Sequence, residues 1–155
     1  MPPDDVAALL ASANGLWHAA EAGTTQPLLR GKNFGLLCEP GEDDALDNAH
    51  LFRTAATALG AHVAQIRPSL SALATPQQVQ HTARLLGRLY DAVECQGMAA
   101  ALVQQIGRDA GVPVYDGVAT VQHPTARLAE QLALEAPLID RRRAVVQAVL
   151  LSTVL

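Results

Sequence analysis

Short apolar runs alternate with helical segments along this chain, and the alternation constrains the fold more than any other feature. The runs with strand character span residues 33–39, 61–68, 91–96 and 112–117. Segments with helical periodicity or helix-capping signals span residues 4–21, 47–60, 75–90, 98–111, 123–136 and 138–155. Strands that alternate with helices of this length predict βαβ units. We therefore expect an α/β fold: a three-layer αβα sandwich with a four-stranded or slightly larger parallel sheet and helices on both faces.

Several predicted helix ends carry recognisable signals. Thr75 is a suitable N-cap because Pro76 follows it at the first helical position. Gly60 and Gly111 stand where two helices are expected to end. Open parallel sheets bind their ligands in the loops at the carboxyl ends of the strands.

Charge and composition exclude some classes of partner. The 155 residues carry a net charge of −4 and only 3% aromatic residues. Nucleic acids and anionic membrane surfaces attract concentrated Lys and Arg, so neither is expected as a partner. The longest apolar run, residues 144–155, is too short to span a bilayer. With no basic leader at the N-terminus, we expect a cytoplasmic protein of one domain, residues 1–155, without a cofactor.

Two cysteines and an acidic loop are the other chemical features of note. Cys38 and Cys95 fall in strand-like runs without metal-ligand spacing, so we expect buried thiols. The loop after the first strand has the layout of an anion site, because a helix N-terminus follows it. The loop is nevertheless acidic, and no Lys or Arg occurs between residues 33 and 52. Its acids are Glu39, Glu42, Asp43, Asp44 and Asp47.

Two interpretations of this acidic loop remain open. In the first, Asp43, Asp44 or Asp47 supplies oxygens that cap the helix, together with Asn48. In the second, Glu42, Asp43, Asp44 and Asp47 ligate a divalent cation, although their spacing does not match an EF-hand.

Five segments of the chain resemble the aspartate and ornithine carbamoyltransferases in their order. They read LLRGKNFGLLCE, LFRTAATALGAHV, HTARLLGRLYDAV, AGVPVYDG and HPTARLAEQL. Residues 4–134 are similar to the carbamoyl-phosphate-binding half of that family. Residues 138–155 resemble its closing helix, which packs back on the first domain. The resemblance therefore implies a core of residues 1–134 and a returning helix, with no amino-acid-binding domain between them.

The resemblance also assigns a degenerate phosphate site. The family's Ser-Thr-Arg-Thr run, which clasps the phosphate, aligns with Ala45, Leu46, Asp47 and Asn48, so an acid stands in place of the arginine. The family's lysine from a neighbouring subunit aligns with Gln80, and its arginine after the third strand aligns with Gln96.

A second motif of the family is partly kept. The His-Pro-Cys/Thr-Gln run appears as His123, Pro124, Thr125 and Ala126. In the family the histidine bonds the carbamoyl oxygen and the glutamine holds the carbamoyl amino group. The chain retains the first as His123 and has Ala126 in place of the second.

Three hypotheses on function follow from these residues. The leading one is a catalytically inactive carbamoyltransferase-like protein that acts as a structural, assembly or regulatory module, with His123 a family remnant. The alternative is an enzyme or a binder of a small molecule or cation at the old carbamoyl phosphate site. An active carbamoyltransferase, completed by a partner chain, is the third. The resemblance implies a homo-oligomer, by default a trimer, and a full-length carbamoyltransferase is a further candidate partner.

Overall fold

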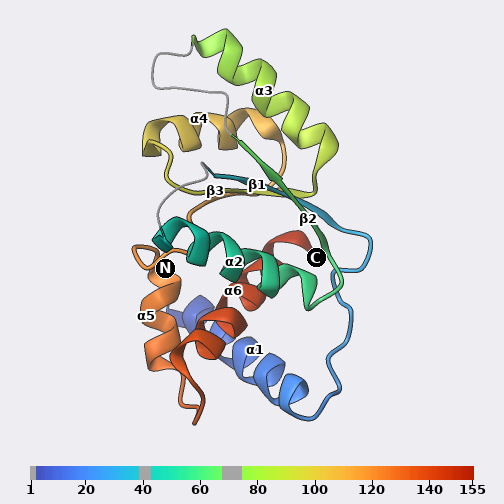
Figure 1. The fold of residues 1–155 in the computed structure, drawn as a ribbon, viewed down its shortest axis with the longest axis vertical. Helices are drawn as coiled ribbons and strands as arrows, with labels where there is room; N and C mark the ends of the chain where they lie inside the picture. The colour runs from blue at the N-terminus through green and yellow to red at the C-terminus, as the bar shows by residue number, and fades with distance from the viewer. Residues whose placement is uncertain (1–2, 39–42, 68–74) are drawn as a thin grey trace.

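The core of the protein is a four-stranded parallel sheet (Figure 1). The structure, a computed structural model, describes residues 3–38, 43–67 and 75–155. The strands lie in the order β2-β1-β3-β4. Their bounds are β1 Asn33–Leu37, β2 His62–Ile66, β3 Ala92–Cys95 and β4 Val114–Asp116. The predicted parallel α/β sheet is confirmed, and its order makes β1 and β3 neighbours at the centre.

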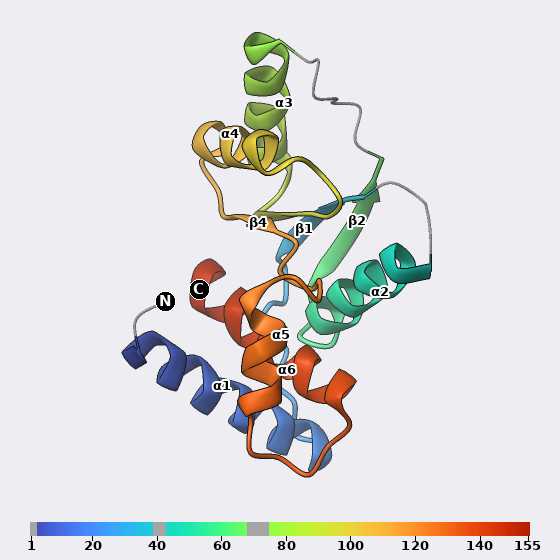
Figure 2. The same cartoon turned by 90° about the vertical axis from the view of Figure 1, so that its left-hand side faces the viewer.

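Helices cover both faces of this sheet. Their bounds are α1 Pro3–Glu21, α2 Asp43–Thr57, α3 Pro76–Leu89, α4 Ala100–Ala110, α5 Pro124–Gln131 and α6 Leu138–Val154. Helices α3 and α4 lie on one face, and α2 and α6 lie on the other (Figures 1 and 2). Helices α1 and α5 pack on α6, farther from the sheet, so this side has an additional layer.

Three clusters of buried apolar side chains hold these layers together. One joins the sheet to α2 and α6 around Phe34 and Phe52, whose rings meet edge to face with centroids 6.0 Å apart. A second joins the sheet to α3 and α4 around Ile106. A third joins α1, α5 and α6 around Val145. Both cysteines are buried, as predicted, and Gln65 Nε2 lies 3.1 Å from Cys38 Sγ.

Two features of α3 follow directly from its sequence. Thr75 is the N-cap, and a capping box joins its side chain and backbone to Gln78, as the Thr-Pro signal predicted. Gly87 lies at the crossing of α3 and α4. A Cβ atom there would come within 1.8 Å of Ala110 O, so the two helices approach this closely only because residue 87 has no side chain.

Three predicted helix boundaries are wrong, and two of them belong to α2, which also ends at Thr57 and not at Gly60. Helix α2 begins at Asp43, not at Asp47, so Asp47 and Asn48 lie inside the helix and neither is its N-cap. Acidic residues are favoured in the first turn, where the helix end is partly positive, and this agrees with the earlier start. Helix α5 ends at Gln131 because Leu132 adopts an extended conformation.

No helix in the described part of the chain is long and apolar enough to cross a membrane.

Candidate functional site

Gln96 joins three elements at the carboxyl end of the sheet. Its backbone N–H donates to Leu37 O at 2.9 Å, which extends the β1–β3 pairing by one residue. Its side chain is 5% exposed, and Nε2 donates to Asn48 O and to Glu94 Oε2, both at 3.2 Å. The side chain that the resemblance aligns with a phosphate-binding arginine therefore links β3 to α2.

Glu94 is the buried acid of this region. It is 0% exposed, and its carboxylate accepts from Val118 N at 3.0 Å and Ala119 N at 3.1 Å. These amides belong to the loop between β4 and α5, so the carboxylate holds that loop against β3. Burial raises the pKa of Glu94 to about 7, while the hydrogen bonds from the two amides and Gln96 act in the opposite direction.

His123 opens α5 as its N-cap. Its Nδ1 accepts from Thr125 N at 3.2 Å, so the neutral imidazole carries its proton on Nε2. Burial lowers the pKa of His123, and the carboxylate of Asp116 acts in the opposite direction. The neutral ring can donate one hydrogen bond from Nε2, and its acceptor nitrogen is already used by the helix.

A chain of hydrogen bonds connects His123 to Gln96. Thr125 N donates to His123 Nδ1, and Thr125 Oγ1 donates to Val118 O at 2.6 Å. Val118 N then donates to Glu94, which accepts from Gln96. Gln96 and His123, which come from two different motifs of the resemblance, thus belong to one hydrogen-bonded network.

A polar cavity lies beside this network, at the carboxyl ends of β3 and β4. Its volume is about 430 Å³. The lining residues are Gly97, Asp116, Gly117, Thr120, Gln122, His123 and Pro124. Asp116 is the one charged side chain in this lining, so the cavity is suited to a cation or a hydrogen-bond donor.

The nearby arginines of α6 are engaged in contacts within the fold. Arg142 donates to Ala119 O at 3.1 Å, and Arg141 donates to Ala129 O at 3.3 Å. Arg143 pairs with Asp140 at 3.1 Å. Within the described residues, no lysine or arginine donates a hydrogen bond to Gln96 or Glu94. Gln96 Oε1 is buried and lacks a partner there.

The structure places the remaining predicted site residues apart from this network. Gln80 lies on α3, across the sheet from α2. Asp47 is exposed on α2. Ala45 and Leu46 precede it in the first turn of the same helix. Among the candidate metal ligands, Glu42 lies outside the described residues. No group of three or more His, Cys, Asp or Glu suited to a metal occurs in the described residues.

Sequence reasoning missed Glu94. Val93 and Cys95 flank it, so the local pattern indicates only an apolar strand. A charged residue inside a run that is buried on both faces is itself a signal, since such a residue needs partners.

Comparison with known proteins gives the family. Residues 1–136 match the family model described as aspartate/ornithine carbamoyltransferase, carbamoyl-P binding domain. The chain belongs to the aspartate/ornithine carbamoyltransferase family. The ornithine carbamoyltransferase of Cutibacterium acnes is 37% identical over 131 residues, which are 84% of this chain and 38% of the relative. The catabolic ornithine carbamoyltransferase of Burkholderia mallei is 36% identical over 140 residues, 88% of this chain and 41% of the relative.

Solved carbamoyltransferase structures have the same fold. Ornithine carbamoyltransferase from Pyrococcus furiosus superposes with a TM-score of 0.69 at 22% identity, over 83% of this chain and 40% of that one. The mitochondrial enzyme from Coccidioides immitis gives 0.70 at 13% identity, over 90% and 45%. The chain thus spans about two fifths of the length of these carbamoyltransferases, and the 155 residues do not include the amino-acid-binding domain.

Proposed function

We propose that this carbamoyltransferase-family chain is catalytically inactive and acts as a structural, assembly or regulatory module. The observation that carries the proposal is the state of Gln96. This residue stands where the resemblance places a phosphate-binding arginine, and its amide nitrogen is already bonded to Asn48 O and Glu94. The position therefore has no positive charge, and its donors serve the fold.

Electrostatics supports the same conclusion. Carbamoyl phosphate carries about two negative charges, and transfer of the carbamoyl group develops more charge on the leaving phosphate. Each lost charge-assisted hydrogen bond costs about 1.5–3 kcal/mol of binding. Here an acid at Asp47 and amides at Gln80 and Gln96 replace the three cations that the resemblance implies. A buried carboxyl group, Glu94, adds negative charge beside Gln96 once it ionises.

Assembly is the second part of the proposal. The family resemblance implies a homotrimer, and a full-length carbamoyltransferase is the alternative partner. Exposed apolar side chains offer surface for such contacts. They are Leu85 and Leu89 on α3 and Leu138 and Ile139 at the start of α6.

Calorimetry with carbamoyl phosphate tests the loss of the substrate site. We expect no saturable binding to the purified chain, while the double variant Asp47→Arg, Gln96→Arg gains measurable affinity because it restores two cations. The ornithine carbamoyltransferase of Cutibacterium acnes serves as the positive control. A Kd tighter than about 100 μM for the unaltered chain would overturn the proposal.

Light scattering after size-exclusion chromatography tests the assembly. We expect a trimer of the chain alone at micromolar concentration. A monomer that forms a complex with a full-length carbamoyltransferase would favour the second partner. A monomer that forms no such complex would remove the assembly role.

The cavity beside Asp116 supports a second candidate function, a cation binder at the old strand-end site. The Asp116 carboxylate and the neutral His123 in this cavity suit an ammonium group better than a phosphate. In a thermal-shift measurement, putrescine should raise the melting temperature of the unaltered chain but not of Asp116→Asn. Equal shifts in both proteins, or none in either, would exclude this candidate.

A further inference from the structure

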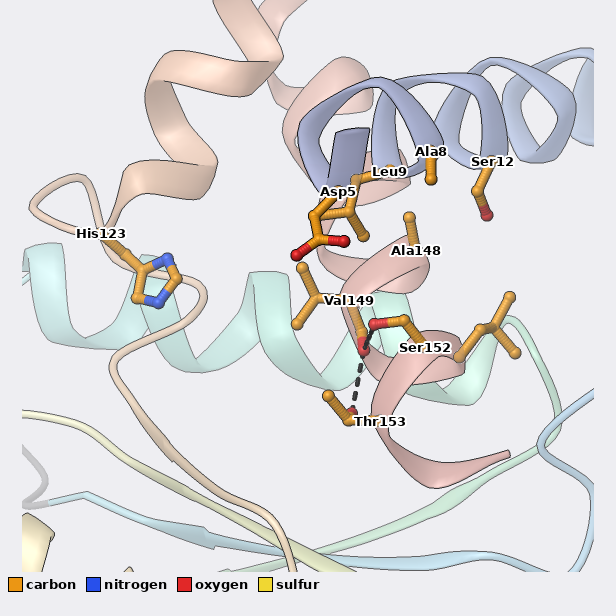
Figure 3. A pocket seen from close by; sticks show the side chains of 10 residues that line it. Asp5, Ala8, Leu9, Ser12, His123, Ala148, Val149, Ser152 and Thr153 are labelled. Carbon is orange, nitrogen blue, oxygen red and sulfur yellow. Dashed lines mark hydrogen bonds between the residues drawn. The ribbon is translucent and has the colours of Figure 1, made fainter. Parts of the chain in front are cut away.

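A groove separates part of α1 from part of α6 (Figure 3). Its volume is about 620 Å³, within the range of about 300–1,000 Å³ that is typical of small-molecule sites. Helix α1 contributes Asp5, Ala8, Leu9 and Ser12, whose helical spacing places them on one face. Helix α6 contributes Ala148, Val149, Leu151, Ser152 and Thr153, and His123 closes one end.

The groove exists because small residues face each other between two packed helices. Helix α1 is anchored to α6 through buried Ala13 and its neighbours in the third apolar cluster. Ala8 and Ala148 face each other across the groove (Figure 3), and each has only a methyl group as its side chain. The helices therefore stay in contact along one stripe and leave space along the next, lined mainly by apolar atoms of Leu9, Val149 and Leu151.

The hydroxyl groups of α6 face this groove chiefly as acceptors. Ser152 Oγ donates to Val149 O at 2.8 Å, and Thr153 Oγ1 donates to the same oxygen at 2.9 Å. Each hydroxyl has a single proton, and Thr153 Oγ1 also lies 2.5 Å from Tyr115 OH, where either oxygen can donate. Ser152 Oγ therefore keeps lone pairs that can accept a hydrogen bond from a ligand, whereas Thr153 Oγ1 is already bonded to Tyr115.

The charge of the lining points to the same kind of ligand. Asp5 is the one charged side chain among the described residues that line the groove, and its carboxylate projects from α1 toward the gap (Figure 3). His123 is neutral near pH 7, because burial lowers its pKa. An anionic ligand would face the Asp5 carboxylate without a compensating cation, whereas an ammonium group would find acceptors on both helices.

We propose that this groove binds a small organic cation, consisting of an ammonium group on an apolar body. The ammonium group donates to the Asp5 carboxylate and to Ser152 Oγ, and the body packs between Leu9 and Val149. A free small molecule is the fitting occupant, because α1, α6 and the start of α5 border an open groove of ligand size. The groove shares His123 with the strand-end network, but Asp5 and Ser152 belong to the groove and not to the strand-end cavity, and the proposal does not depend on whether the chain is catalytic.

Methyl NMR with 4-phenylbutylamine as the probe tests this site. Chains labelled at alanine methyl groups report on Ala8 and Ala148 directly. We expect saturable shifts of these two signals with the amine. The neutral alcohol 4-phenylbutanol, which has the same apolar body, should bind at least about tenfold more weakly. Equal affinity for the two probes would overturn the proposal, since the charge would then contribute nothing.

Matched variants locate the binding. Asp5→Asn should weaken binding of the amine by up to about fivefold, the upper end for an exposed ion pair. Asp4→Asn removes a neighbouring charge that does not line the groove, and affinity should stay within about twofold. Ala8→Trp, at an exposed position, should fill the groove and abolish the shift of Ala148.

Three outcomes would contradict the assignment. The first is equal affinity of the Asp5→Asn and Asp4→Asn proteins for the amine. The second is weakened binding in Asp116→Asn with none in Asp5→Asn, which would place the amine in the strand-end cavity. The third is the absence of any shift at millimolar amine in the unaltered chain.

Discussion

Glu94 is a carboxyl group without exposed surface, held by two backbone amides and one side-chain amide. Its pKa is about 7 in the folded chain, against 4.5 for a model glutamate. Between these values the folded state binds more protons than the unfolded state. The free energy of unfolding contributed by Glu94 is therefore greatest below pH 4.5, and is lost as the pH rises through 7.

The variant Glu94→Gln tests this dependence. At about 1.4 kcal/mol per pKa unit, the loss between pH 4.5 and 8 is on the order of 3 kcal/mol. Urea unfolding across this range should show a falling stability for the unaltered chain, relative to the variant. The lowered pKa of His123 gives a slope of opposite sign, but His123 is present in both proteins and cancels in the difference. The exposed Glu130→Gln is the control, and a difference slope equal to that control would contradict the prediction.

Single residues were predictable where the motif alone determines the conformation. Thr75 and Pro76 specify a helix start, and His123 with Pro124 specifies another, because capping depends on near neighbours. Glu94 could not be placed in this way. Its partners, Val118 and Ala119, lie about two dozen residues further along the chain, so the loop that satisfies it becomes visible only in the fold.

At the scale of elements, the alternation of apolar and helical segments predicted the sheet and the helices, but not every boundary. Strand and helix types follow from local periodicity. The start of α2 does not, because a helix N-terminus with several acids in a row has more than one acceptable cap. The bond from Gln96 Nε2 to Asn48 O fixes α2 against β3, and it joins residues that are 48 positions apart.

The crossing of α3 and α4 provides a prediction at this scale. Gly87→Ala should destabilise the protein by about 3 kcal/mol, because its Cβ would overlap the backbone oxygen of Ala110 and the helices would have to separate. Gly107→Ala is the matched control, since its Cβ would lie at an ordinary 3.7 Å from Val114. The control should gain up to about 1 kcal/mol of helix propensity. Equal effects of the two variants on chemical denaturation would rule out the close crossing.

At the scale of the whole molecule, α6 joins two cores. Val146 and Leu150 belong to the cluster under the sheet with α2, whereas Val145 and Ala148 belong to the cluster with α1 and α5. Gln147 Nε2 adds a buried hydrogen bond to Ala55 O at 3.1 Å. Residues 1–136, which match the family domain, therefore lack a helix on which both clusters depend.

A chain that ends at residue 136 should consequently fail to fold alone. Removing α6 exposes the apolar partners of both clusters, and burial of such side chains contributes about 1.5–3 kcal/mol each. We expect no cooperative thermal transition in circular dichroism for this fragment, and recovery of the transition when residues 137–155 are co-expressed as a second chain. Removal of Leu155 alone, which is 67% exposed, is the control and should leave the transition in place. Cooperative unfolding of the fragment at the midpoint of the full chain would contradict this prediction. The sheet and the remaining helices would then stabilise the two clusters without α6.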